Sequence, residues 1–120
     1  IHTRKCGGLE KSAVFSTGGR LMFKNPDDYR RFENLAKPAA VTRFSADCYA
    51  YGLLAMGCID AVCEAGMKLY DYAALIPVVT GAGGVMTDWN GKALDVRSDG
   101  HVLALGDAEL LDSALKALNS

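Results

Sequence analysis

The sequence predicts the α/β class, as a layered α/β sandwich built around a central mixed sheet. Two observations lead to this class. Short β-prone segments alternate with segments of helical periodicity, and an Asn90-Gly91 pair between two β-prone segments indicates a hairpin near the end. The chain has 120 residues, of which 50% are hydrophobic and 22% are charged, so it can form one domain with a moderate core.

The first expected elements are a strand, an amphipathic helix and a second strand. Residues 13–17 are β-prone and are followed by two glycines. In the helix, Asn25 can cap the N-terminus and Pro26 suits the first position, while Lys37-Pro38 ends the segment. Residues 41–44 form the second expected strand.

Two apolar helices are expected next, with a strand between them. Residues 46–56 are apolar on nearly every side, which is typical of a buried helix. Residues 60–64 form the strand, and residues 70–80 form the second helix, which we also expect to be buried. Pro77 lies inside that second helix, where its missing N–H predicts a kink or a local opening.

A glycine-rich turn follows the second apolar helix. Gly81-Ala82-Gly83-Gly84 comes after a helix and before a strand, whereas a phosphate-binding loop comes before its helix. We therefore interpret these glycines as a helix stop and a tight turn.

A hairpin, a strand and a helix complete the expected fold. Residues 85–89 and 92–96 flank the Asn-Gly pair, which favours a type I′ turn. Residues 101–105 form the last strand. Asp107 caps the final helix, whose apolar stripe predicts packing on the sheet.

Composition argues against several classes of partner. The net charge is −1, which does not favour nucleic acid or a membrane surface, and no apolar run reaches the ~20 residues that span a bilayer. No leader sequence is visible. The four cysteines include no Cys-x-x-Cys pair, which argues against zinc. We expect Cys48, Cys58 and Cys63 to be buried and reduced, in a cytoplasmic protein.

Three acids next to apolar sequence indicate a candidate site. Asp47 and Asp71 fall in the first turns of the two apolar helices, and Glu64 falls at a strand end. Helix starts and strand ends meet at the edge of an α/β sheet, where ligands bind. Converging carboxylates repel one another unless a cation joins them, and Mg²⁺ prefers carboxylate oxygens. The alternative is that these acids are ordinary helix caps and solvated strand ends.

Two motifs resemble a known superfamily. Tyr70-Asp71-Tyr72-Ala73-Ala74, with the later Gly81-Ala82-Gly83-Gly84, resembles the C-terminal half of the inositol-monophosphatase superfamily. That superfamily has Trp-Asp-x-Ala-Ala and Glu-Ala-Gly-Gly at these places, so Tyr70 and Gly81 are departures. The stretch ADCYAY, with Arg43 upstream and Pro77 downstream, is similar to the histidinol-phosphate phosphatase branch.

The resemblance implies an enzyme and roles for individual residues. It implies a Mg²⁺-dependent phosphomonoesterase that acts on L-histidinol phosphate, with Asp71 as the catalytic metal ligand. Glu64 and Asp47 are implied to contact the substrate, because carboxylates suit the ammonium of histidinol. Arg43 and Ser45 are weaker candidates for the same pocket. The alternatives are an inositol or sugar-phosphate phosphatase, and a non-catalytic α/β module for binding or assembly.

The resemblance also implies a missing half. The superfamily's Asp-Pro-Ile-Asp-Gly-Thr motif does not occur in these residues. We therefore expect residues 1–8 to be the tail of a connecting segment and residues 9–120 to be the C-terminal α/β domain. The expected partners are the N-terminal half of the same protein, a second copy in a homodimer, and a small phosphate ester. The 120 residues alone are expected to be inactive.

Overall fold

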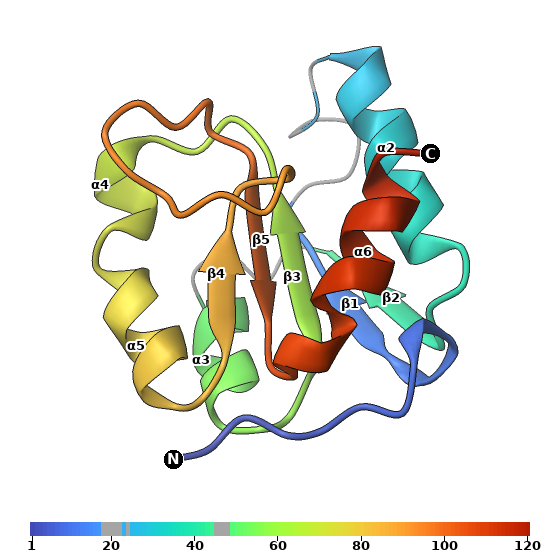
Figure 1. The fold of residues 1–120 in the computed structure, drawn as a ribbon, viewed down its shortest axis with the longest axis vertical. Helices are drawn as coiled ribbons and strands as arrows, with labels where there is room; N and C mark the ends of the chain where they lie inside the picture. The colour runs from blue at the N-terminus through green and yellow to red at the C-terminus, as the bar shows by residue number, and fades with distance from the viewer. Residues whose placement is uncertain (18–22, 24, 45–48) are drawn as a thin grey trace.

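The computed structural model describes residues 1–17, 23, 25–44 and 49–120. In that part of the chain, five strands form one mixed sheet with helices on both faces, as the sequence predicts (Figure 1). The strands are β1 (Ala13–Phe15), β2 (Val41–Arg43), β3 (Ala61–Glu64), β4 (Val85–Thr87) and β5 (Val102–Leu105). The strand order is β2-β1-β3-β5-β4. Strand β1 pairs in parallel with β2 and β3, whereas β5 is antiparallel to β3 and β4.

Helices cover both faces of the sheet and make a three-layer sandwich. Helices α2 (Pro26–Ala36) and α6 (Leu111–Leu118) lie together on one face. Helices α3 (Tyr49–Ala55), α4 (Leu69–Tyr72) and α5 (Leu75–Gly81) lie on the other. Short 3₁₀ helices, η1 (Leu9–Lys11) and η2 (Ala108–Leu110), precede β1 and α6. No helix in the described ranges has the length and apolar character needed to cross a membrane.

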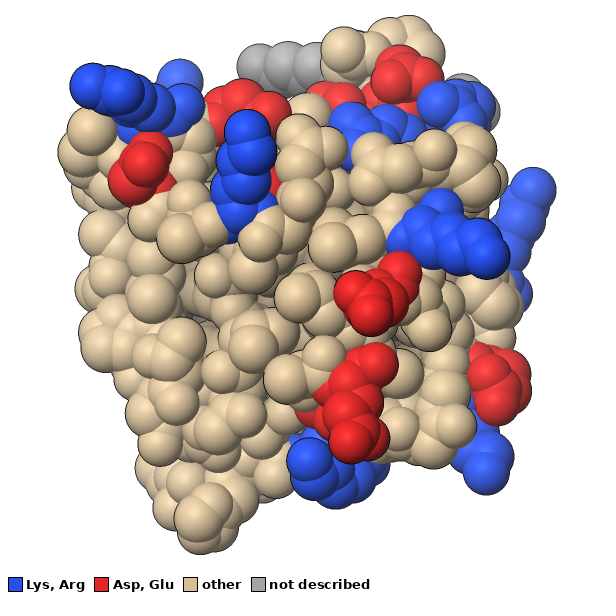
Figure 2. All heavy atoms as spheres, viewed as in Figure 1, with Lys and Arg blue, Asp and Glu red and all other residues tan. Residues whose placement is uncertain are grey.

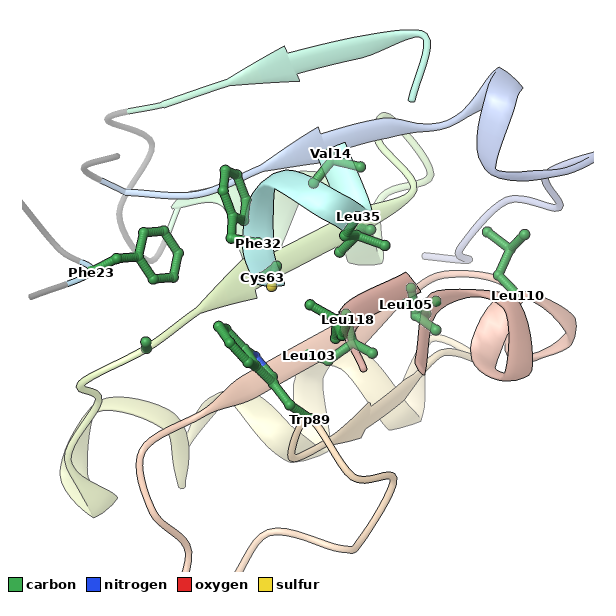
Figure 3. Packing of buried hydrophobic residues seen from close by; sticks show 13 residues of the cluster. Val14, Phe23, Phe32, Leu35, Cys63, Trp89, Leu103, Leu105, Leu110 and Leu118 are labelled. Carbon is green, nitrogen blue, oxygen red and sulfur yellow. The ribbon is translucent and has the colours of Figure 1, made fainter. Parts of the chain in front are cut away.

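The core has two parts, one on each face of the sheet. Leu103 and Leu105 point to the α2 and α6 side, and Val102 and Ala104 point to the α3 and α5 side. All four of these β5 side chains are fully buried. Figure 3 shows Trp89 and the leucines of β5 and α6 packed together in the first part. The sheet is therefore covered on both faces, as its continuous apolar strands require.

The predicted cap of α2 is confirmed, whereas Asp107 caps the 3₁₀ helix η2 that leads into α6. The Asn25 side chain accepts a hydrogen bond from the Asp27 N–H at 2.9 Å, and Pro26 is the first residue of α2. Asp107 accepts from the Glu109 N–H at 3.0 Å, and the chain passes through η2 before α6 begins. Each cap satisfies a backbone donor that the helix leaves without an internal partner.

The second apolar helix is broken, as Pro77 predicts. The chain forms α4, passes through turn residues Ala73 and Ala74, which keep right-handed helical dihedral angles, and begins again as α5. A continuous helix would need an N–H at Pro77 to bond the Ala73 carbonyl, and proline has none. The prediction that this helix is buried is wrong, because Tyr72 and Val79 are its only buried members within α4 and α5.

The glycine-rich turn is a helix stop, as predicted. The Gly84 N–H bonds to the Val79 carbonyl at 3.0 Å, and Gly83 has φ 102°, in the left-handed region. A Cβ on Gly84 would lie 2.6 Å from the carbonyl oxygen of Leu105, so only glycine fits there. After this turn the chain leaves α5 and returns to the sheet as β4.

The predicted second arm of the hairpin does not form. A single bridge joins Thr87 to Ala93, and no strand covers residues 92–96. The Asp88 carboxylate accepts hydrogen bonds from the N–H groups of Asn90 and Lys92, at 2.8 and 2.9 Å. This side chain closes the turn locally, and such local bonds compete with a strand ladder.

The cysteines only partly follow the prediction. Cys63 on β3 is fully buried, and burial raises the pKa of its thiol. Cys58 is exposed, contrary to the prediction, because it lies in the loop between α3 and β3. Cys48 lies outside the described residues.

The segment before η1 is fastened to the domain by buried acids. The Thr3 N–H bonds to the Ala82 carbonyl at 3.0 Å. Arg4 donates two hydrogen bonds of 2.8 Å to the two carboxylate oxygens of Asp60, and the Cys6 N–H donates to Asp107 at 3.0 Å. Both acids are 2% exposed. Hydrogen bonds of Thr3, Arg4 and Cys6 therefore hold this segment at the end of the sheet opposite Glu64.

Candidate functional site

The candidate site lies at one edge of the sheet. Strands β1, β2 and β3 are mutually parallel in direction, so their carboxyl ends meet at the same edge. Thr17, Arg43 and Glu64 come at or just after those ends. Strand β5 runs the other way, and its first residue, Val102, pairs with Glu64, which brings His101 to this edge as well.

Glu64 is a buried carboxylate held by two hydroxyl groups. Its side chain is only 3% exposed. The Tyr51 hydroxyl donates to Oε1 at 2.5 Å, and the Thr17 hydroxyl donates to Oε2. Burial, together with the charge and the hydrogen bond of Glu64, raises the pKa of Tyr51 well above its usual value. Tyr51 therefore stays protonated at neutral pH and acts as the donor.

Asp71 is exposed, contrary to the expectation of a buried acid. It is in the first turn of α4, and its Oδ2 accepts the Lys68 N–H at 2.9 Å. This contact is a normal way to satisfy a helix N-terminus. The carboxylate is also accessible to a ligand from solvent.

The described residues do not contain a complete metal centre. Across the described ranges, no group of three or more His, Cys, Asp or Glu side chains is placed to hold a metal ion. Carboxylate oxygen is the donor that Mg²⁺ prefers, so Asp71 fits in chemistry. One carboxylate does not fit in number, and further ligands are needed from elsewhere.

Of the other predicted site residues, the structure describes Arg43 but not Ser45 or Asp47. Arg43 is exposed at the end of β2, and its Nη1 donates to the Thr42 carbonyl at 3.3 Å. Asp47 and Ser45 lie outside the described residues. The structure thus brings Arg43 and Glu64 to the same sheet edge.

Two polar contacts at this edge were missed from sequence. Tyr51 and Thr17 are the donors to Glu64, and neither stands out as a site residue. Tyr51 does belong to the ADCYAY stretch, which is the signal that could have identified it. For Thr17 the sequence indicates only the end of a strand.

A histidine cluster was also missed. His101 Nε2 lies 2.9 Å from Asp28 Oδ2, and Nδ1 lies 3.2 Å from Asp99 Oδ2. The imidazole stacks on Trp89, with ring centroids 4.3 Å apart. These contacts tie α2 to the loop before β5, so we interpret the cluster as structural.

The fold and this edge define an α/β domain that presents polar side chains where parallel strands end, the usual ligand position in such sheets. Comparison with protein families makes the class specific. The family model described as "Inositol monophosphatase family" matches residues 2–120, and the chain belongs to this family.

Individual relatives agree with that family. The chain is 36% identical over 125 residues to "Bifunctional phosphatase IMPL2, chloroplastic" of Arabidopsis thaliana, covering 98% of this chain and 36% of the relative. It is 31% identical over 80 residues to "Histidinol-phosphatase" of Chlorobaculum parvum, covering 67% of this chain and 31% of the relative. A solved inositol monophosphatase from Zymomonas mobilis superposes with a TM-score of 0.95 at 40% identity, over 100% of this chain and 47% of that chain.

The chain spans only about a third of the length of these curated relatives and less than half of the Zymomonas chain. The similarity therefore covers one part of each of these longer relatives.

Proposed function

We propose that this chain is the C-terminal part of a Mg²⁺-dependent phosphomonoesterase that hydrolyses L-histidinol phosphate to histidinol and phosphate. The observation that carries this proposal is the buried Glu64 carboxylate at the carboxyl edge of the parallel strands. A buried carboxylate at a ligand edge suits the ammonium of histidinol, which a carboxylate binds through a charge-assisted hydrogen bond. The relative named histidinol-phosphatase supports the same substrate.

The proposed roles of the side chains follow from their chemistry. Glu64 and Asp47 would accept hydrogen bonds from the ammonium group, while Arg43 and Ser45 would contact polar groups of the substrate. Asp71, the proposed catalytic residue, would supply one carboxylate oxygen to Mg²⁺ from its exposed position at the start of α4. The bound metal would neutralise phosphate charge and activate water. We propose that the remaining ligands come from an N-terminal half.

Two alternatives keep specific support. The 40% identity to a Zymomonas inositol monophosphatase favours inositol phosphate or a related sugar phosphate as the substrate. The capping bond from Lys68 to Asp71, together with the lack of a carboxylate cluster among the described residues, favours a non-catalytic binding or assembly module. We further propose a cytoplasmic homodimer for the full-length protein, which analytical ultracentrifugation and cell fractionation would test.

The experiment that tests the proposal is Asp71→Asn in the full-length protein. The amide oxygen of Asn can still accept the Lys68 N–H, so the substitution removes the charge and keeps the helix cap. We expect turnover of histidinol phosphate to fall by at least about 100-fold, because the loss falls on metal binding. The melting temperature should stay close to that of the parent.

Asp88→Asn is the matched control, because Asp88 also bonds local backbone N–H groups. It should leave turnover within about twofold, the range of a site that makes no contact with the transition state. If Asp71→Asn retains activity like the control, Asp71 is only a helix-start residue and the metal proposal fails. A parent enzyme that prefers inositol phosphate would overturn the substrate and leave the role of Asp71 intact.

A further inference from the structure

A buried tyrosine–glutamate pair connects the interior of α3 to the end of β3. Tyr51 is completely buried, and its hydroxyl lies 2.5 Å from Glu64 Oε1. The Sδ of Met67 lies 3.4 Å from the same hydroxyl. The Tyr51 ring belongs to the core on the α3 and α5 side, so its rotamer is fixed by packing.

The pair fixes the direction of the carboxylate. A buried carboxylate needs hydrogen-bond donors, and a neutral phenol supplies one without adding a charge. Tyr51 fixes Oε1 and Thr17 fixes Oε2, so the plane of the carboxylate is held from both sides. Each carboxylate oxygen has two lone pairs and can therefore accept from more than one donor.

We infer that Tyr51 is a positioning residue for substrate specificity: it orients Glu64 toward a cationic ammonium on the alcohol part of the phosphate ester. This inference rests on the proposed function, in which Glu64 contacts the substrate. A charge-assisted hydrogen bond depends on direction, and a carboxylate free to rotate would gain less from the ammonium. Tyr51 acts through Glu64 and does not touch the reacting phosphate.

The chain offers a matched control for the loss of a buried tyrosine hydroxyl. Tyr72 is 2% exposed and packs in the same part of the core as Tyr51. Its hydroxyl donates to the Asp95 carbonyl at 3.0 Å. Tyr72→Phe therefore removes a hydroxyl of similar burial that is bonded to a loop carbonyl.

The test uses steady-state kinetics of the full-length protein with two substrates. Histidinol phosphate carries the ammonium, and 2-glycerophosphate lacks it. Tyr51→Phe should raise KM for histidinol phosphate by about three- to tenfold, the size of one net hydrogen bond, with kcat within about twofold. KM for 2-glycerophosphate should change by less than about twofold, as should both substrates with Tyr72→Phe. Tyr51→Met, which also lacks the hydroxyl and has a side chain that adapts to irregular space, is the second variant if the phenylalanine variant does not fold.

Glu64→Gln separates the two levels of the proposal. If Glu64→Gln leaves the preference for histidinol phosphate unchanged, the substrate role of Glu64 fails, and the inference fails with it. If Glu64→Gln abolishes the preference but both Tyr51 variants keep it, the inference alone is overturned. Equal KM increases on both substrates, or a change confined to the melting temperature, would likewise show that Tyr51 serves only the fold.

Discussion

The ion pair between Arg4 and Asp60 gives a stability prediction that can be worked out from the structure. Asp60 is 2% exposed and accepts two hydrogen bonds from Arg4 and one from the Ala13 N–H, each 2.8 Å long. Arg4→Gln removes the charged donor and leaves a buried carboxylate at the start of β3. Loss of a charged hydrogen-bond partner costs about 1–3 kcal/mol. The Arg4 side chain is 43% exposed, so water replaces part of the loss and the full cost of a buried pair does not apply.

We therefore expect Arg4→Gln to lower the free energy of unfolding by about 2 kcal/mol. With a urea m-value of about 2 kcal/mol/M, the unfolding midpoint should fall by about 1 M. Fluorescence of the single tryptophan, Trp89, reports the transition because that side chain is fully buried. Arg30→Gln is the control, since its pair with Asp27 is 55% and 60% exposed. Exposed pairs contribute about 0–1 kcal/mol, so the control midpoint should move by less than half as much.

The effect of Arg4→Gln should depend on pH in a defined direction. Burial raises the pKa of Asp60. The hydrogen bonds from Arg4 and Ala13, together with the charge of Arg4, lower this pKa by more than burial raises it, so the net pKa lies below its usual value. A carboxyl with a lowered folded-state pKa stabilises the fold above its unfolded pKa, about 4, and this stabilisation is lost as the pH falls through the folded pKa. The gap between Arg4→Gln and the parent should therefore be large at about pH 7 and small at about pH 2. Equal midpoint shifts for Arg4→Gln and Arg30→Gln, or a gap that does not shrink in acid, would refute the reasoning.

Two further predictions concern the proposed chemistry. Asp47→Ala in the full-length protein should raise KM for histidinol phosphate by about ten- to a hundredfold, the size of a charge-assisted hydrogen bond, and change hydrolysis of 2-glycerophosphate much less; equal losses on both substrates would assign Asp47 to the fold. The 120-residue chain alone should release no phosphate from either ester in Mg²⁺, because one or two carboxylates do not hold this ion against its hydration; Mg²⁺-dependent phosphate release by the purified chain would contradict this.

The order of strands and helices was predictable because the signals that set it are local. Asn25 and Asp107 mark helix starts through hydrogen bonds within a few residues, and Pro26 suits the first helical position. Asn25 and Pro26 begin α2 as predicted, and Asp107 caps η2, which leads into α6. Pro77 predicted the break between α4 and α5 for the same reason. The hairpin prediction failed because the Asp88 side chain, rather than a second strand, satisfies the turn.

Burial was less predictable than secondary structure. The apolar segment of α4 and α5 was expected to be buried, yet Leu69, Tyr70 and Val78 are 44%, 81% and 47% exposed. In Figure 2 the lower left of the molecule, where α5 lies in Figure 1, carries no Lys, Arg, Asp or Glu. Hydrophobicity reports a preference for burial and does not say whether this chain supplies a covering element.

The candidate site was predictable in position but not in detail. Glu64 was predicted to lie at a strand end because a charged residue next to an apolar strand is unusual, and the structure places it at the end of β3. Its partner Tyr51 was not predicted, since helical periodicity does not tell which strand end a buried side chain reaches. That contact depends on the packing of α3 against β3. Ser45 and Asp47 remain sequence-based predictions.

Asp71 changes the argument for a metal. From sequence, an acid at the start of a buried apolar helix is expected to need a cation that offsets the cost of burial. The structure places Asp71 in solvent with a hydrogen bond from the Lys68 N–H, so that cost does not arise. Folding leaves this exposed carboxylate in water, so a cation can reach it from solvent. The metal proposal thus depends on family membership and on the accessibility of Asp71, and the charge-only substitution Asp71→Asn is the measurement that separates a ligand from a helix cap.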